Sequence, residues 1–175
     1  MFKKIVTSPT PRSYLESMDR YRAFYEEYKD RLFAYLIRIT GDYDLASDIL
    51  QEAFTRYLEH YRGKDQSVSL LYAIARHALF DHLRRQRRTS LLNEGQEPHS
   101  GDQEQALLIR DEYRRVLEAL HRIEKSEREI LALAVSGDLT YREIASITGT
   151  SESNVKVKVH RARVKLKEIL NRGDV

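Results

Sequence analysis

The chain has 175 residues, with 30 Lys or Arg against 27 Asp or Glu, a net charge of +3 and a pI near 9.0. It contains no Cys, which excludes disulfides and thiol chemistry. Its mean hydropathy is −0.60 and no apolar run approaches membrane-spanning length, which excludes a membrane-embedded protein. Long charged and apolar stretches with few Gly and Pro predict an all-α fold, in one domain or two small ones.

Residues 1–17 contain two of the three prolines and little periodicity, which predicts a flexible N-terminal tail. Their apolar stretch is too short for a signal peptide. From about Met18 the apolar residues recur at steps of three and four, which predicts a helix that ends at Gly41. These residues are Tyr21, Phe24, Tyr25, Tyr28, Leu32, Tyr35, Leu36 and Ile39.

A second helix is expected after Asp42 and Asp44, since acidic side chains suit the positive end of a helix. Its apolar face is predicted to consist of Leu45, Ile49, Ala53, Phe54, Tyr57, Leu58 and Tyr61. The opposite face is polar and carries Asp48, Glu52, Thr55 and Glu59. A polar loop is expected over residues 62–69.

A third helix is predicted from about Leu70 to Arg88, with Leu71, Ile74, Ala75, Ala78 and Leu79 facing inward. It ends in four arginines within five residues, which either bind DNA or form a solvated helix end with cations at its negative terminus. The composition of residues 89–105 predicts a linker, because residues 93–105 contain four acidic residues and no Lys or Arg. The chain is therefore expected to form two small helical domains, 18–88 and 106–171.

The second domain shows two capping boxes, Ser126–Glu129 and Thr140–Glu143, each of which predicts the start of a helix. The segment from Thr140 to Gly149 and the basic segment after it have the spacing of a helix-turn-helix. A glycine permits the tight turn, and small or apolar residues let the two helices approach.

The last helix carries six Lys or Arg and no acid between Val155 and Lys167. On a helical wheel, one stripe is predicted to be buried: Val155, Val159, Ala162, Leu166 and Ile169. Ser153, Val157 and Val164 lie opposite, flanked by the cations. Each cation can neutralise a phosphate, so we interpret the helix as DNA-binding; the alternative is a solvated charged face. Val157 either contacts a thymine methyl or is a scattered surface apolar residue.

Three strings in the first half occur in a definite order before this helix-turn-helix. They are Asp48-x-x-Gln51-Glu52-x-Phe54, then Ile74-Ala75-Arg76, then Asp81-x-Leu83-Arg84-Arg85. With Val155-Lys156 and Arg161-Ala162-Arg163, this order resembles the extracytoplasmic-function sigma factors of bacterial RNA polymerase. The resemblance runs from about Tyr21 to Leu170. Many relatives have a polar residue where this chain has Val157.

The resemblance implies a cytoplasmic initiation factor whose partners are core RNA polymerase, promoter DNA and a restraining anti-sigma factor. Residues 18–88 would bind the clamp helices of the largest subunit and open the −10 element; residues 106–171 would read the −35 element and pack on the flap of the second-largest subunit. The residues implied for the polymerase are Asp48, Gln51, Glu52, Thr55 and Glu59. Those implied for the −10 element are Arg62, Lys64, Arg76, His77, Phe80, Arg84, Arg85, Arg87 and Arg88. Those implied for the −35 element are Thr140, Ser151, Ser153, Asn154, Lys156, Val157, Lys158, His160, Arg161 and Arg163.

The sequence shows no nucleophile with a base, no Gly-rich phosphate loop and only scattered histidines, so we expect no enzyme activity, cofactor or metal site. One rival interpretation is a stand-alone helix-turn-helix regulator with a sensor or dimerisation domain in residues 1–100. A second rival is an adaptor that binds the polymerase but never DNA. The arginine-rich helix of the first domain disfavours the former, and the basic last helix disfavours the latter.

Overall fold

A computed structural model describes residues 11–61, 66–92 and 111–172, which form α-helices and contain no strand. The all-α prediction is therefore confirmed for these residues. The helices are α1 (Pro11–Thr40), α2 (Tyr43–Tyr61), α3 (Val68–Leu92), α4 (Asp111–His121), α5 (Lys125–Ser136), α6 (Tyr141–Thr148) and α7 (Glu152–Asn171).

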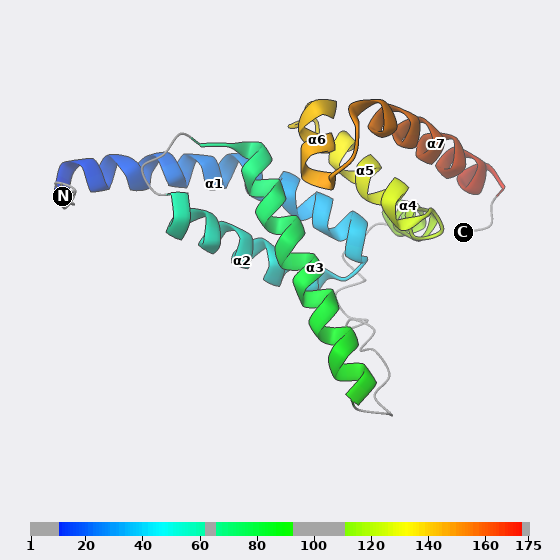
Figure 1. Cartoon of the computed structure of the whole chain (residues 1–175), viewed down its shortest axis with the longest axis horizontal. Helices are drawn as coiled ribbons and strands as arrows, with labels where there is room; N and C mark the ends of the chain where they lie inside the picture. Colours follow the sequence, from blue (N-terminus) through cyan, green and yellow to red (C-terminus); the bar gives the residue numbers. More distant parts are fainter. Residues whose placement is uncertain (1–10, 62–65, 93–110, 173–175) are drawn as a thin grey trace, which may run out of the picture.

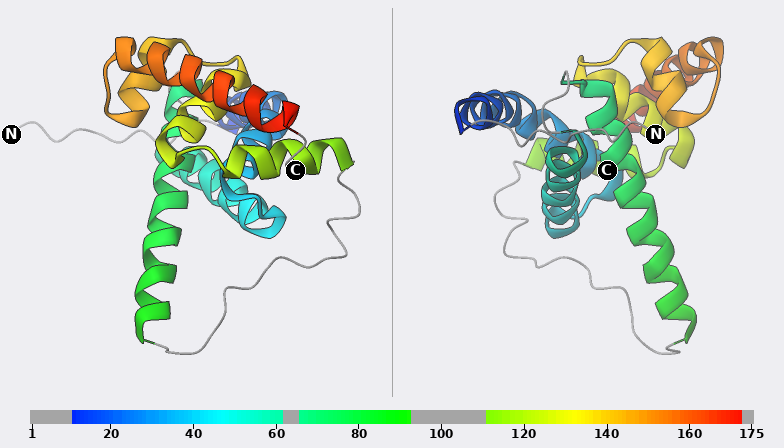
Figure 2. Two further views of the ribbon diagram at one scale, coloured as in Figure 1. Left: turned by 90° about the vertical axis from the view of Figure 1, so that its right-hand side faces the viewer. Right: turned by 60° about the vertical axis from the view of Figure 1, so that its left-hand side comes forward.

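Helices α1, α2 and α3 form the first helical unit, in which α1 and α2 run side by side and α3 crosses them (Figure 1). Its core is aromatic: the rings of Phe24 and Tyr57 stack with centroids 5.1 Å apart, and Phe54 meets Phe24 edge-on. The Tyr21 hydroxyl donates to the backbone carbonyl of Phe54 at 2.9 Å, which joins α1 to α2. The C-terminal part of α3 projects away from the rest of the protein in both views of Figure 2.

Helices α4 to α7 form the second unit, and α6 and α7 make the predicted helix-turn-helix. Thr140 and Glu143 form the predicted capping box at the start of α6. Gly149 ends α6 with φ +69°, a left-handed conformation that favours glycine and gives the turn its sharpness. Ile144 on α6 and Val155 on α7 are fully buried, so the two helices share one small apolar core.

The two units pack against each other through α1 with α5 and α3 with α6 (Figure 1). Their buried apolar residues form one continuous core, to which Tyr72 and Leu133 contribute from opposite sides. Polar contacts also cross the boundary. The carboxylate of Asp138, just after α5, forms an ion pair with Arg31 and accepts a hydrogen bond from the Tyr72 hydroxyl at 2.9 Å.

Three details correct the sequence-based predictions. The predicted tail, residues 1–17, is already helical from Pro11, because proline is well tolerated in the first turn of a helix, where backbone N–H groups have no intrahelical partner. Helix α3 runs to Leu92, so the first four residues of the predicted linker are helical. The N-cap of α5 is Glu124, whose side chain accepts from the backbone N–H groups of Ser126 and Glu127; Ser126 is not the cap. The acidic stretch 93–105 lies outside the described residues.

Within the part of the chain that the structure describes, no helix combines the length and the apolar character needed to cross a membrane.

Gly41 joins α1 to α2 with φ +68°, and a β-carbon there would lie 2.9 Å from Nε2 of His121 in the second unit. We expect Gly41→Ala to lower the free energy of unfolding by about 1–2 kcal/mol, mainly because alanine is strained at positive φ. The imidazole edge can rotate away, so most of the loss should persist in a His121→Ala background. Urea unfolding followed by circular dichroism measures both. A loss that disappears in the His121→Ala background would identify the contact, and not the backbone, as its cause.

Candidate nucleic-acid interfaces

Helix α7 is fixed by its buried stripe and by its N-terminus. Val155, Val159 and Ala162 are buried, which confirms the predicted inward face. Ser151 is the N-cap and accepts from the backbone N–H of Asn154 at 3.2 Å. The side-chain amide of Asn154 donates to the Thr150 hydroxyl at 2.6 Å. These contacts hold the first turn in place, so the side chains that follow it point in defined directions.

The face opposite the stripe is exposed, as the sequence predicted. Val157 is 45% exposed and Val164 43% exposed, and Ser153 lies beside them at the start of the helix. The side chains of Lys156, His160, Arg161 and Arg163 around this face are exposed as well. In a DNA major groove, an apolar side chain in this position can contact the base edges while the surrounding cations contact the phosphates on either side.

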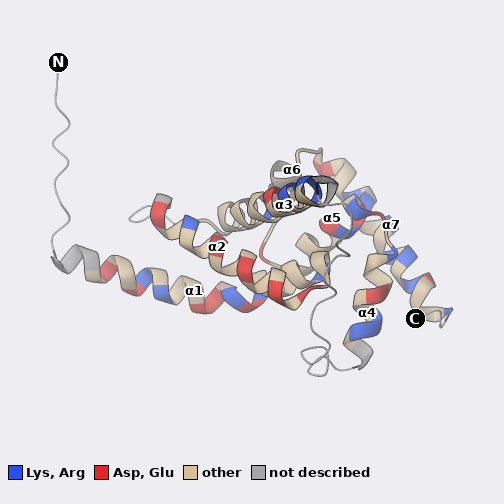
Figure 3. Ribbon diagram, turned by 90° about the horizontal axis from the view of Figure 1, so that it is seen from below, with Lys and Arg blue, Asp and Glu red and all other residues tan. Residues whose placement is uncertain are grey.

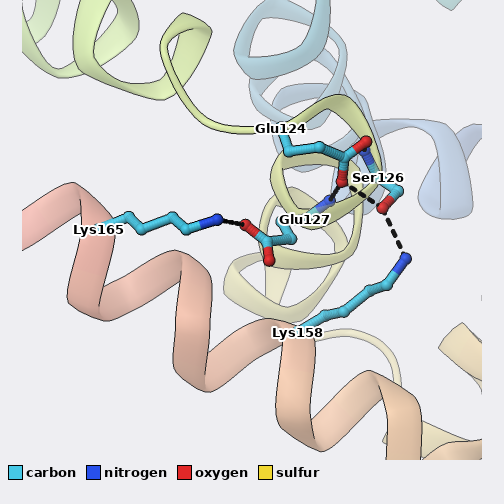
Figure 4. Close-up of polar contacts among 5 residues, drawn as sticks. All are labelled: Glu124, Ser126, Glu127, Lys158 and Lys165. Carbon is cyan, nitrogen blue, oxygen red and sulfur yellow. Dashed lines mark hydrogen bonds and ion pairs between the residues drawn. The ribbon is translucent and has the colours of Figure 1, made fainter.

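Two lysines of α7 contact α5 (Figure 4). Nζ of Lys158 donates to the Ser126 hydroxyl at 2.6 Å, and Nζ of Lys165 lies 2.6 Å from Oε2 of Glu127, whose side chain is 9% exposed. The Ser126 hydroxyl in turn donates to Glu124. Lys158 therefore has a structural role that the sequence did not reveal, because its partners lie 32 positions away.

Glu124 is the centre of this small network. Hydrogen bonds from the Ser126 hydroxyl and backbone, with a smaller contribution from Lys158, lower the pKa of the Glu124 carboxyl. An anion at this position also suits the N-terminal end of α5. The contacts hold α7 against α5, and with it the direction of the exposed face that carries Val157.

The other predicted −35 residues are partly engaged within the protein. Lys156 forms an ion pair with Glu152 one turn earlier, 2.8 Å between Nζ and Oε1, with both side chains exposed. Such a pair is weak and exchanges readily with phosphate. Thr140 is exposed, and its hydroxyl and backbone N–H both contact the Glu143 carboxylate.

The predicted −10 residues that the structure describes lie along α3. Arg76 does not point to open solvent: its Nε lies 2.6 Å from Oε1 of Glu129 on α5, and its guanidinium lies over the Phe80 ring, 4.8 Å from the centroid. His77 is exposed, and Phe80 is 42% exposed. Arg62 and Lys64 lie outside the described residues.

The arginine cluster at the end of α3 makes its polar contacts within α3 itself, and Arg84, Arg87 and Arg88 also line a cavity at the boundary with the second unit. Arg84 pairs with Asp81 one turn earlier at 2.8 Å, and Nε of Arg85 donates to the Asp81 backbone carbonyl. Arg87 and Arg88 are exposed. The cluster therefore lies on the projecting part of α3 (Figure 2), where a long anionic partner can reach it.

The predicted polymerase-binding residues lie on α2, where acidic residues follow one another along the helix (Figure 3). Asp48, Gln51, Thr55 and Glu59 are exposed. Glu52 differs from them, because it is half-buried and forms an ion pair with Arg56.

Helix α1 adds to the same surface, which the sequence analysis missed. A groove of about 610 Å³ runs between α1 and α2, with Gln51 and Thr55 at its α2 edge. Tyr21, Tyr25 and Phe54 form its apolar part. The aromatic periodicity of α1 was visible in the sequence but was assigned wholly to the core. In the described segments no group of three His, Asp or Glu is placed to hold a metal ion.

Comparison with protein families identifies both units. The family model for Sigma-70 region 2 matches residues 24–89, and that for Sigma-70, region 4 matches residues 113–166. The chain is 31% identical over 155 residues to the ECF RNA polymerase sigma factor SigM of Bacillus subtilis, covering 85% of this chain and 94% of the relative. It is 31% identical over 163 residues to the RNA polymerase sigma factor YlaC of the same organism, covering 89% and 92%.

Solved structures share the fold. The sigma factor RpoE of Bartonella quintana, in complex with the anti-sigma factor NepR, superposes with a TM-score of 0.74 at 20% identity, covering 87% of this chain and 98% of that one. CnrH, in complex with the cytosolic domain of CnrY, superposes with a TM-score of 0.67 at 16% identity, covering 92% and 94%.

The Glu124 cap gives a pH-dependent prediction. Because the pKa of Glu124 is lowered in the folded protein, its carboxylate stabilises the fold above its ordinary pKa near 4.5. This stabilisation is lost as the pH falls through the lowered folded value. Glu124→Gln should therefore cost about 0.5–1 kcal/mol at pH 7, and the difference from the original protein should vanish at acid pH. Urea titrations at several pH values measure it.

Glu118→Gln, at an exposed position on α4, is the matched control and should leave stability unchanged throughout. A Glu124→Gln difference that stays constant down to pH 3 would show that the carboxylate charge is not what caps α5.

Proposed function

The chain belongs to the extracytoplasmic-function (ECF) sigma factors and directs promoter-specific transcription initiation by RNA polymerase, and we propose how its two helical units divide this work. Like other sigma factors it is not an enzyme, so its contribution is binding and DNA opening. We assign residues 18–88 to polymerase binding and the −10 element, and residues 106–171 to the −35 element. The main observation behind the assignment of the second unit is the exposed face of α7, where Val157 lies among Lys and Arg side chains.

The −35 element is read by α7 from the major groove. Val157 contacts a thymine methyl, and Ser153 at the helix start reaches a phosphate or base edge. The exposed cations Lys156, His160, Arg161 and Arg163 bind the flanking phosphates, with Thr140, Ser151 and Asn154 close to the same edge. Lys158 combines a structural contact to Ser126 with a place beside the groove.

The −10 element is opened and bound along α3. Phe80 supplies an exposed ring on which an unstacked base can lie, and His77 supplies a polar edge. The arginines that end α3 hold the strand backbone. Arg62 and Lys64, which precede α3 in the sequence and lie outside the described residues, complete the proposed surface.

The polymerase is bound by the exposed acidic face of α2. Asp48 and Glu59 offer carboxylates to basic residues of the clamp helices, and Gln51 and Thr55 border the groove between α1 and α2. That groove accepts an apolar side chain of the partner between Tyr21 and Phe54. The second unit packs on the flap of the second-largest subunit.

The packing of the two units restrains this activity in the free protein. The Glu129 carboxylate forms an ion pair with the Arg76 guanidinium. A DNA phosphate therefore has to displace this carboxylate before it can bind Arg76. Helix α6 packs beside α3 here, and Glu143 lines a pocket together with His77, so a DNA strand at His77 meets a carboxylate of the second unit. Core polymerase would separate the units to promoter spacing and release both surfaces.

This function places the protein in the cytoplasm with the polymerase and the genome. Two solved structures of the same fold are complexes with an anti-sigma factor or with the cytosolic domain of a partner, which supports a regulatory partner of that kind for this chain.

Mixing the purified protein with bacterial core RNA polymerase and fragmented genomic DNA tests the function directly. We expect discrete start sites that share two spaced motifs and that disappear when core polymerase or the protein is omitted. Sequencing the transcripts measures this. Tight binding to a palindromic site without polymerase would instead support a stand-alone regulator.

A matched pair of variants tests the polymerase surface, and the affinity of each variant for core polymerase is the measurement. Asp48→Lys with Glu59→Lys should weaken core binding about tenfold or more, since it reverses two charges at the interface. Asp30→Lys, at an exposed position on α1, is the control and should bind as the original protein does.

The Val157 contact is tested by removing either partner. We expect Val157→Ser to weaken promoter binding by the polymerase complex roughly fivefold, the scale of one lost methyl contact. Replacing the contacted thymine by uracil should have the same effect on the original protein and none on the variant. Competitive binding to synthetic promoters measures both. Val164→Ser, farther along the same exposed face, is the control; equal losses for both variants would show that Val157 has no specific contact.

A further inference from the structure

A cavity of about 910 Å³ lies at the boundary between the two helical units. The end of α1 and the start of α2 form one wall, α3 forms the second, and the turn from α4 into α5 forms the third. This volume lies in the range of cavities that hold small molecules. Its α3 wall shares Phe80, Arg84, Arg87 and Arg88 with the proposed −10 surface, whereas its α5 wall, with Lys125 and Arg128, belongs to none of the surfaces assigned above.

The lining of the cavity has an apolar side and a cationic side. Ile39, Leu45, Phe80 and Leu83 are its apolar members. Arg87, Arg88, Lys125 and Arg128 are cations for which no ion pair is found among the described residues. The carboxylates are engaged elsewhere: Asp81 pairs with Arg84, Glu129 pairs with Arg76, and Asp42 caps α2 through the backbone N–H of Leu45. The cavity therefore carries a surplus of positive charge.

Arg128 is the strongest indication that the cavity binds an anion. Its residue is only 8% exposed, and its Nε has no hydrogen-bond partner. Burial lowers the pKa of Arg128, with a smaller opposing influence of Glu124. The Nε itself is enclosed by protein atoms, so it is the charge of the guanidinium that points to a ligand. A buried cation without an ion pair is costly, and an anion in the cavity beside the guanidinium offsets part of that cost. His121 lines the same cavity, and burial, with the nearby Arg128, lowers its pKa.

We propose that this cavity binds a nucleoside polyphosphate. Its phosphates accept from Arg128 and Lys125, with Arg87 at the outer edge, and its base lies against Phe80 and Leu83. An inorganic phosphate chain would satisfy the cations but leave the apolar wall in water. A nucleotide satisfies both.

A ligand held by α3 on one side and α5 on the other favours the packed arrangement of the two units over the separated one. Bound nucleotide would therefore oppose engagement of core polymerase. This consequence depends on the proposed function, whereas the binding site itself does not.

The site is tested with the full free protein, without polymerase, by fluorescence anisotropy of GTP carrying a fluorescent label on its ribose. We expect saturable binding, with inorganic triphosphate competing about tenfold more weakly than unlabelled GTP. Arg128→Met should weaken GTP binding by about tenfold or more. Lys125→Met, at an exposed position, tests the same site without disturbing a buried residue, and should weaken binding severalfold.

Arg115→Met is the control, because Arg115 is an exposed arginine on α4 outside the cavity, and it should bind GTP unchanged. Absence of saturable binding, or equal losses in all three variants, would overturn the site. Binding of a short single-stranded DNA that depends on Arg128, without binding of GTP, would also overturn it by showing a nucleic-acid site.

A second measurement separates this site from the proposed function. GTP should weaken the binding of the protein to core polymerase, and Arg128→Met should abolish that effect while transcription with core polymerase persists. GTP binding with no effect on the polymerase would overturn the regulatory consequence. Loss of core-dependent transcription from the original protein would contradict the proposed function instead.

Discussion

The arrangement of the two helical units depends on the carboxylate of Asp138. Its side chain is only 3% exposed, and its two oxygens are engaged by different helices of the first unit: Arg31 of α1 forms an ion pair with it, and the Tyr72 hydroxyl of α3 donates to it. A buried carboxylate without these partners would destabilise the interface, because the desolvation of the charge would go uncompensated. The interaction therefore specifies one packing of the second unit on the first, while the apolar core around Tyr35, Tyr72 and Leu133 supplies most of the burial.

That packing links the DNA surfaces to one another. Glu129 is two turns or so before Asp138 along the same segment, and it holds Arg76, a residue of the proposed −10 surface. On the other side of α5, Ser126 and Glu127 hold Lys158 and Lys165 of the recognition helix (Figure 4). Helix α5 thus lies between the two proposed DNA-binding helices and contacts both. Under the proposed function, a polymerase that separates the units would break the contacts of α5 to α3 and keep those to α7, so the proposed −10 surface would be released while the α5–α7 packing stays intact.

Much of the fold could be predicted from the sequence, because the information is local. The periodic aromatics of α1, the buried stripe of α7 with its exposed Val157, and the Thr140 capping box are patterns within one or two turns, and the structure confirms them. The contacts between the units could not be predicted, since Tyr72 and Asp138 lie 66 positions apart and neither forms a motif. The start of α1 at Pro11 and the cap at Glu124 were missed because weak periodicity and an acidic cap give faint signals. Most candidate site residues on α2, α3 and α7 are exposed as predicted, but Glu52, Arg76, Asn154 and Lys158 are half-buried and have partners within the chain. The exposed Lys156 and Arg84 also form ion pairs with neighbours on their own helices.

The central claim is that the two units are packed together in the free protein and separate on the polymerase. The absence of native Cys allows a spin label to be placed at each of two introduced cysteines, one replacing Ala23 on α1 and one replacing Glu168 on α7, both exposed. The distance between the labels can then be measured by pulsed electron paramagnetic resonance, free and with core polymerase. We expect one narrow distance distribution in the free protein and a longer distance in the complex. A broad distribution in the free protein, unchanged by the polymerase, would contradict the claim that the units are packed together.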